Sequence, residues 1–178
     1  DPLDIVLDDP RSNAVLIGPG HGVGLETKKR VLEVLAAGKM TVLDADALTS
    51  FAGVDAVTLF EAIESCTGQV VITPHEGEFS RLFGVYEGFD RLSLVRKAAS
   101  TSGATVLLKG SDTVIAAPDG RAALSAGGPA WLATGGSGDV LAGLIVGLMA
   151  QGLQGWKAAC AGDWLHSAAA REVGPGLI

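Results

Sequence analysis

Short apolar runs alternate with amphipathic segments along most of the chain, and this alternation limits the fold more than any single motif does. The apolar runs are predicted strands at 14–17, 41–43, 69–73 and 104–108. The amphipathic segments are predicted helices at 26–37, 55–65, 77–83 and 91–102. Strands that alternate with helices form a mostly parallel sheet with helices on both faces, so the predicted class is α/β.

The remaining segments complete a one-domain plan. Residues 112–117 and 121–124 flank the turn Pro118-Asp119-Gly120, which predicts a hairpin near 112–124. Helices are predicted at 138–151 and 156–172, and the polar segment 1–13 is expected to be irregular. The sequence contains no linker or internal repeat, so residues 1–178 are predicted to form a single domain.

Composition and charge exclude several classes of protein. An apolar fraction of 48% supports a sizeable core, and a net charge of -7 argues against nucleic acid as the main partner. The longest apolar stretch, 140–150, is too short to span a bilayer, so no membrane association is expected. Cys66 and Cys160 are too few for a disulfide framework, and no signal peptide is recognised. These features predict a cytoplasmic protein with reduced thiols.

A glycine-rich loop precedes the helix predicted at 138–151. Gly135, Gly136, Ser137 and Gly138 are small residues that leave backbone N–H groups uncovered. Unpaired N–H groups and the dipole at a helix N-terminus together form an anion site. Asp139 follows inside this positive end, where it would repel a phosphate, so we interpret it as a general base that faces a hydroxyl. The alternative is that Asp139 is only a first-turn residue favoured by the dipole.

Polar and glycine residues gather where the predicted strands end. Residues 18–22 follow the first strand, Asp44 and Asp46 the second, His75 the third and Lys109 the fourth. The carboxyl ends of parallel strands share one edge, where ligands of such sheets bind. The glycine-rich loop precedes a helix that can point its N-terminus at the same edge. This convergence predicts a phosphate-containing ligand and acid–base chemistry there.

Five blocks of the sequence match one known family in the family's order. They are 13–22, 42–48, 73–79, 108–113 and 132–143. On these blocks the chain resembles the ADP/ATP-dependent NAD(P)H-hydrate dehydratases, carbohydrate-kinase-like members of the ribokinase-like superfamily. The glycine-rich loop alone fits any ribokinase-like kinase. Asp-Ala-Asp-Ala-Leu in the second block together with Thr-Pro-His-Glu-Gly-Glu in the third is much more specific.

Two features depart from the family pattern. His21 stands where family loops usually have Leu. The chain also starts after the place of the family's first βα units, which supply part of the sheet and of the substrate pocket. The resemblance therefore implies a ribokinase-like domain without these N-terminal units.

The resemblance also implies a reaction. The substrate is NADH or NADPH that carries a hydroxyl on its nicotinamide ring after hydration. ADP or ATP phosphorylates this hydroxyl, and loss of phosphate restores the reduced cofactor. Asp139 would accept the hydroxyl proton, and the loop would form the anion hole with Gly135, Gly136, Ser137 and Gly138.

Binding roles follow from the same resemblance. The nucleotide would lie along Lys109, Gly110, Ser111, Asp112 and Thr113, and against Gly138. The substrate would contact Gly20, Gly22, His75 and Asp139. Each assignment has a structural alternative. Lys109 would be a solvated lysine before a turn, His75 would make hydrogen bonds within its loop, and Gly20 and Gly22 would belong to an ordinary strand-to-helix turn.

Magnesium is the expected metal, because it prefers carboxylates and phosphates. Its candidate ligands, acting through water, are Asp44, Asp46 and Glu78; capping of the following segment is the alternative role for the two aspartates. The histidines lack the spacing of a zinc site; they are His21, His75 and His166. The tryptophans are expected in the core or at an interface; they are Trp131, Trp156 and Trp164.

Two other functions stay open. A ribokinase-like kinase for a vitamin precursor or a sugar would share Asp139 and the anion hole. A non-catalytic nucleotide-binding module would bind ADP without turnover. A homo-oligomer is expected for the dehydratase, and the sequence does not distinguish ADP from ATP or NADH hydrate from NADPH hydrate.

Overall fold

A computed structural model describes residues 2–85, 88–125 and 127–175. Its centre is a six-stranded sheet with the order β1-β2-β3-β4-β5-β6. Four strands are parallel: β1 (Ala14–Ile17), β2 (Met40–Leu43), β3 (Val70–Ile72) and β4 (Thr105–Leu108). The antiparallel hairpin of β5 (Val114–Ala116) and β6 (Ala122–Leu124) completes the sheet. The mostly parallel α/β sheet and its hairpin are therefore confirmed.

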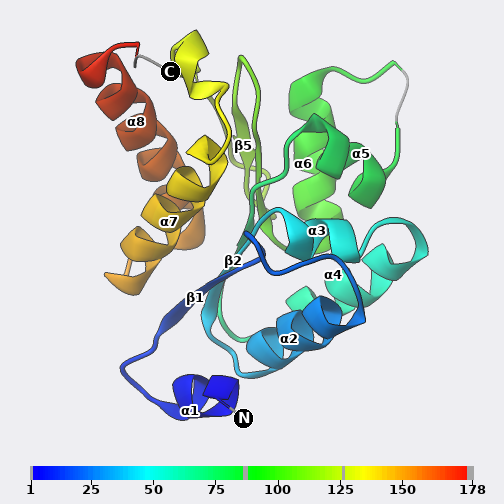
Figure 1. The fold of residues 1–178 in the computed structure, drawn as a ribbon. Helices are drawn as coiled ribbons and strands as arrows, with labels where there is room; N and C mark the ends of the chain where they lie inside the picture. Colours follow the sequence, from blue (N-terminus) through cyan, green and yellow to red (C-terminus); the bar gives the residue numbers. More distant parts are fainter. Residues whose placement is uncertain (1, 86–87, 126, 176–178) are drawn as a thin grey trace.

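Helices cover both faces of the sheet (Figure 1). One face carries α2 (Leu25–Ala36), α3 (Asp46–Ser50), α4 (Ala56–Ser65), α5 (Glu76–Phe83) and α6 (Arg91–Ser102). The other face carries α7 (Ser137–Ala150) and α8 (Gly155–Val173). The parallel strands follow one another in one direction across the sheet, so right-handed crossovers place all of their helices on the same face. Among the described helices, α7 and α8, which follow the hairpin, cover the other face.

Alternating side chains of the strands divide the core into two layers. Neighbouring strands are in register, so that Ile17 lies opposite Leu43, Leu43 opposite Ile72, and Ile72 opposite Val106. This row faces the layer of α2 to α6. The residues one position earlier or later point the other way, toward α7 and α8; they include Val42, Val71 and Leu107. Strands buried on both faces account for the nearly continuous apolar runs in the sequence.

The structure differs from the prediction at the start of the chain. Residues Pro2–Asp8 form helix α1, not an irregular segment. Leu3 and Leu7 are one helical turn apart, and both pack against the core layer of α2 to α6. The other two apolar side chains of this helix, Ile5 and Val6, are exposed, so its apolar residues do not follow a helical period that the sequence would show. Short 3-10 turns at Gly53–Asp55 and Ala130–Leu132 complete the described elements. Within the described residues, no helix has the length and apolarity that crossing a bilayer requires.

Candidate functional site

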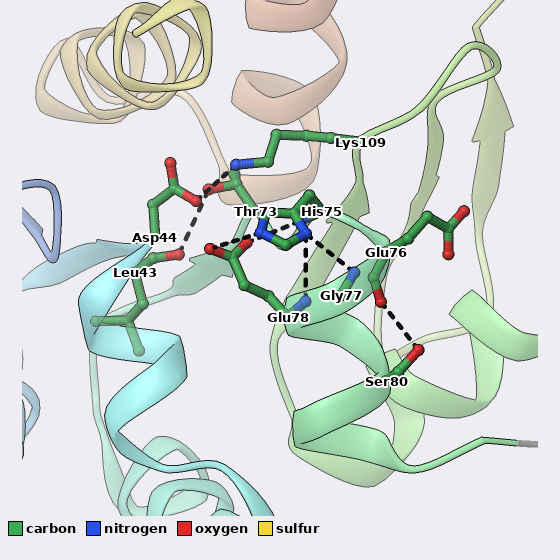
Figure 2. Close-up of polar contacts among 9 residues, drawn as sticks. All are labelled: Leu43, Asp44, Thr73, His75, Glu76, Gly77, Glu78, Ser80 and Lys109. Atoms are coloured by element: carbon green, nitrogen blue, oxygen red, sulfur yellow. Dashed lines mark hydrogen bonds and ion pairs between the residues drawn. The ribbon is translucent and has the colours of Figure 1, made fainter. Parts of the chain in front are cut away.

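An ion pair joins the ends of two strands at the carboxyl edge of the sheet. Asp44 follows β2 and Lys109 follows β4, and Nζ of Lys109 lies 2.8 Å from Oδ1 of Asp44 (Figure 2). The Asp44 side chain is 1% exposed and that of Lys109 is 22% exposed. Burial raises the pKa of Asp44, and the charge and hydrogen bond of Lys109 oppose this rise. Lys109 is thus held over the edge by a carboxylate, rather than extended into solvent.

The glycine-rich loop lies directly beside this ion pair. A Cβ atom at Gly138 would lie 3.2 Å from Nζ of Lys109 and 3.9 Å from Oδ2 of Asp44. Gly136, with φ +86, precedes α7 and supplies no side-chain cap. Within the described residues, no group accepts a hydrogen bond from the N–H of Gly138 or of Asp139. Two unpaired N–H groups and a lysine ammonium therefore converge, which is an arrangement suited to an anion.

Asp139 lies in the first turn of α7 and is exposed. Its carboxylate takes part in no hydrogen bond or ion pair within the described chain. The helix-capping position belongs to Gly136, so Asp139 does not cap the helix with its side chain. Its carboxylate is available to accept a proton beside the predicted anion site.

His75 caps helix α5. Its Nδ1 accepts hydrogen bonds from the N–H of Gly77 at 2.9 Å and of Glu78 at 3.3 Å, and Glu78 accepts one from the N–H of His75 at 2.8 Å (Figure 2). This reciprocal pattern is a capping box. The structural alternative for His75 is therefore realised at Nδ1. Its Nε2 lies 3.4 Å from Oε1 of Glu78, and the side chain is 54% exposed, so part of the ring faces solvent at the sheet edge.

The glycine loop after β1 packs against the segment after β2. A Cβ at Gly18 would overlap the carbonyl of Asp44, which requires glycine there. The N–H of Gly22 donates to Oδ2 of Asp46 at 2.8 Å. Gly20 and Gly22 are exposed, and apart from its chain neighbours no described residue has an atom within 4 Å of a Cβ built on either. Both therefore leave open space in which a ligand can approach the backbone.

A strained residue turns the two aspartates apart. Ala45 has φ 49 and is the one non-glycine residue with positive φ in the described part of the chain. Asp44 on one side pairs with Lys109, and Asp46 on the other side holds the loop of Gly22. Helix α3, which the sequence did not predict, begins directly at Asp46. Strain of this kind is common at functional sites.

The expected magnesium ligands do not form a protein cage. Among the described residues, no group of three or more His, Cys, Asp or Glu side chains is placed to hold a metal ion. Asp44, Asp46 and Glu78 each have a partner already: Lys109, the N–H of Gly22 and the N–H of His75. Mg²⁺ usually keeps several waters and binds substrate phosphates, and such a site does not require three protein ligands.

The predicted nucleotide segment is anchored at both ends. The N–H of Lys109 donates to the carbonyl of Pro74 at 2.9 Å, and the carbonyl of Thr113 accepts from the N–H of Ser125 at 2.9 Å. Thr113 is buried, so its contribution is structural. Gly110, Ser111 and Asp112 are exposed between these anchors. Arg91, which the sequence did not single out, donates to the carbonyls of Leu108 at 3.4 Å and Lys109 at 3.1 Å.

Two pockets lie away from these residues. One of about 530 Å³ is at the opposite edge of the sheet, where β3 and β4 begin, and Trp156 lines it. Another of about 400 Å³ lies between the hairpin and α8, and Trp164 lines it. Neither pocket is lined by Lys109, His75 or Asp139. The candidate site is therefore an open sheet edge and not one of these hollows.

The fold and the sheet-edge site together define a ribokinase-like protein. A solved ribokinase-like superfamily protein from Enterococcus faecalis superposes with a TM-score of 0.77 and 28% identity, over 97% of this chain and 58% of that one. The family model for NAD(P)H-hydrate dehydratase matches residues 4–174. The chain belongs to the NAD(P)H-hydrate dehydratase family.

Individual relatives agree with this assignment. The ADP-dependent (S)-NAD(P)H-hydrate dehydratase of Neisseria meningitidis is 44% identical over 166 residues, which cover 90% of this chain and 55% of the relative. A bifunctional NAD(P)H-hydrate repair enzyme of Mycobacterium leprae is 39% identical, over 94% of this chain and 35% of the relative. The Bacillus subtilis ADP/ATP-dependent NAD(P)H-hydrate dehydratase, crystallised with ATP/Mg²⁺, superposes with a TM-score of 0.79 and 31% identity. The match covers 96% of this chain and 62% of that one. The chain thus spans about half, or less, of its curated relatives.

Proposed function

We propose that this chain carries the phosphoryl-transfer machinery of an ADP- or ATP-dependent NAD(P)H-hydrate dehydratase. One observation carries the proposal: within the described residues the N–H groups of Gly138 and Asp139 and the carboxylate of Asp139 have no partner, and the ammonium of Lys109 lies beside Gly138. A general base and an anion site at one place are the parts that transfer of phosphate to a hydroxyl requires. Membership of the family supports the choice of hydroxyl.

The proposed reaction has two stages. Asp139 accepts the proton of the ring hydroxyl, whose oxygen bonds to the terminal phosphorus of the nucleotide while the bond from that phosphorus to the bridging oxygen breaks. The N–H groups of Gly138 and Asp139 hold the transferring phosphate, and Lys109 offsets its charge. The C–O bond to the new phosphate then breaks as the adjacent ring carbon loses a proton. Inorganic phosphate leaves, and the ring double bond of NADH or NADPH is restored.

The two ligands lie on different loops in this proposal. The nucleotide runs from the anion hole (Gly135 to Gly138) along the exposed part of the segment from Lys109 to Thr113. The hydrate approaches the open backbone of Gly20 and Gly22 and the exposed ring of His75. Bound Mg²⁺ would neutralise phosphate charge, with Asp44, Asp46 and Glu78 acting on it through water.

A recycling assay tests the proposed function. The protein is incubated with NADH hydrate and either ADP or ATP, and recovery of the NADH absorbance band is followed. We expect recovery only with a nucleotide, together with release of inorganic phosphate. A phosphorylated alcohol that accumulates without NADH would indicate a ribokinase-like kinase. ADP binding without any turnover would indicate a nucleotide-binding module.

We propose that the protein is a homo-oligomer. Large apolar side chains remain exposed on the hairpin and α8, including Leu124 at 63% and Trp164 at 65%. Sedimentation equilibrium would give the mass of one chain if this proposal is wrong. The cytoplasmic location, and the expectation of no nucleic-acid partner, remain predictions.

A further inference from the structure

Arg91 lies at the start of α6 and contacts the two segments that follow β3 and β4 at the sheet edge. Its Nη2 donates to the backbone carbonyls of Leu108 and Lys109. Its Nη1 forms an ion pair with Glu76, which begins α5 directly after His75. One guanidinium therefore contacts both the proposed nucleotide segment and the turn that carries His75.

The surroundings of Arg91 are shaped around its side chain. A Cβ at Gly110 would overlap the guanidinium, so the glycine makes room for it. The side chain is 24% exposed, and its Nε is buried and has no hydrogen-bond partner within the described residues. This Nε forms a long ion pair with Oδ1 of Asp112, at 3.9 Å. A planar, five-donor guanidinium can serve several acceptors at fixed angles, whereas a lysine ammonium of similar reach cannot.

We propose that Arg91 is a positioning residue that fixes the His75 turn and the Lys109–Thr113 segment relative to each other. The inference rests on the proposed function in that it takes these two segments as the binding sites of hydrate and nucleotide. Arg91 does not touch the reacting atoms; it acts through the carbonyls of Leu108 and Lys109 and through Glu76. Small displacements of positioned groups reduce phosphoryl transfer strongly, because that reaction depends mainly on alignment.

Arg91 has two sets of contacts, here called arms, and different substitutions remove them. One arm is its hydrogen bonds to the carbonyls of Leu108 and Lys109, and the other is its ion pair with Glu76. Arg91→Gln removes both arms. Arg91→Lys retains a charge for Glu76 but loses the Nη2 group that donates to the carbonyls of Leu108 and Lys109. Glu76→Gln breaks the arm to the His75 turn and leaves the carbonyl contacts in place. We therefore expect Arg91→Lys and Glu76→Gln to affect the binding of different ligands, because each removes one arm.

The test measures ADP affinity by calorimetry and the KM for NADH hydrate by the recycling assay. We expect Arg91→Gln to weaken both and to lower kcat by about 10- to 100-fold, the loss that misalignment typically causes. Arg91→Lys should weaken mainly ADP binding, and Glu76→Gln should raise mainly the KM for the hydrate. Arg30→Gln is the matched control, because Arg30 is 20% exposed and pairs with Glu26 and Glu33 on α2, away from the site.

The outcomes separate this inference from the proposed function. If every variant changes only Tm, as Arg30→Gln is expected to do, then Arg91 is a structural clamp and the inference is overturned. Wild-type protein that binds ADP but does not restore NADH would contradict the proposed function. The ADP affinities of the variants would still decide the role of Arg91 in that case. Wild-type protein that does not bind ADP would overturn both.

Discussion

Asp44 and Lys109 are 65 positions apart in the sequence, yet the ammonium of Lys109 lies 2.8 Å from Oδ1 of Asp44. They meet because β2 and β4 flank β3 in the parallel sheet, so both residues emerge at the same edge. The pair also adjoins Gly138 in the glycine-rich loop. A single ion pair thus connects the sheet edge with the proposed anion hole.

Replacing Lys109 with Met tests the electrostatic cost of burying Asp44. Because burial raises the folded-state pKa of Asp44 above its ordinary 3.8, the folded protein binds this proton more readily than the unfolded chain does. The contribution of Asp44 to the free energy of unfolding therefore falls as the pH rises from 3.8 through the raised pKa. Lys109→Met removes the compensating cation, and we expect the free energy of unfolding to fall by about 1.5–3 kcal/mol near neutral pH.

Urea unfolding across the acidic range checks this prediction. The difference between wild type and Lys109→Met should shrink as the pH falls through the raised pKa of Asp44, because a neutral carboxyl needs no cation. The double variant with Asp44→Asn should recover stability, since position 44 then carries no buried charge that needs a cation. A difference that is constant with pH would contradict the prediction.

Asp139→Asn tests the base. The amide retains the shape of the side chain but cannot accept the proton, so turnover should fall by about 100- to 10,000-fold. ADP affinity should stay the same or rise, because a negative charge beside the phosphates is lost. The recycling assay and ADP calorimetry measure the two effects. Asp119→Asn, in the exposed turn of the hairpin, is the control; more than about a tenth of wild-type turnover in Asp139→Asn would refute a general base.

Gly138→Ala separates folding from phosphate binding. Gly138 lies in the first turn of α7 without positive φ, and alanine is favoured over glycine in helices by about 1 kcal/mol. Its Cβ would nevertheless lie 3.2 Å from Nζ of Lys109. We expect a fold at least as stable as wild type, with ADP binding weakened at least about tenfold if one charge-assisted contact is lost. Gly143→Ala, where no described residue outside the local turn of α7 has an atom within 4 Å of the new Cβ, should leave ADP affinity unchanged.

His75 has two roles that substitutions can separate. His75→Ala removes the cap of α5 and should lower the free energy of unfolding by about 0.5–2 kcal/mol. His75→Asn restores a capping acceptor and should recover most of this loss. If the ring also contacts the hydrate, both variants will raise the KM for NADH hydrate. A wild-type KM in His75→Asn would leave His75 with the capping role alone.

Local sequence determined most of the secondary structure. The predicted boundaries at 14–17 and 91–102 are those of β1 and α6, and the hairpin lies where the Pro-Asp-Gly turn indicated. Burial imposes a period on neighbouring residues, and that period can be recognised in the sequence alone. The helix at Pro2–Asp8 was missed because its two core contacts come from strands and helices far along the chain. The motif blocks also indicated the family that the family model confirms.

The partners within the candidate site were decided only by the tertiary structure. Sequence reasoning brought Asp44, His75 and Lys109 to one edge, but not the ion pair or the capping role of His75. It gave no signal for Arg91, whose position at the start of a helix is ordinary. These contacts join residues whose separation depends on strand order, register and helix placement. Such quantities follow from the packing of the whole sheet, so no local period encodes them.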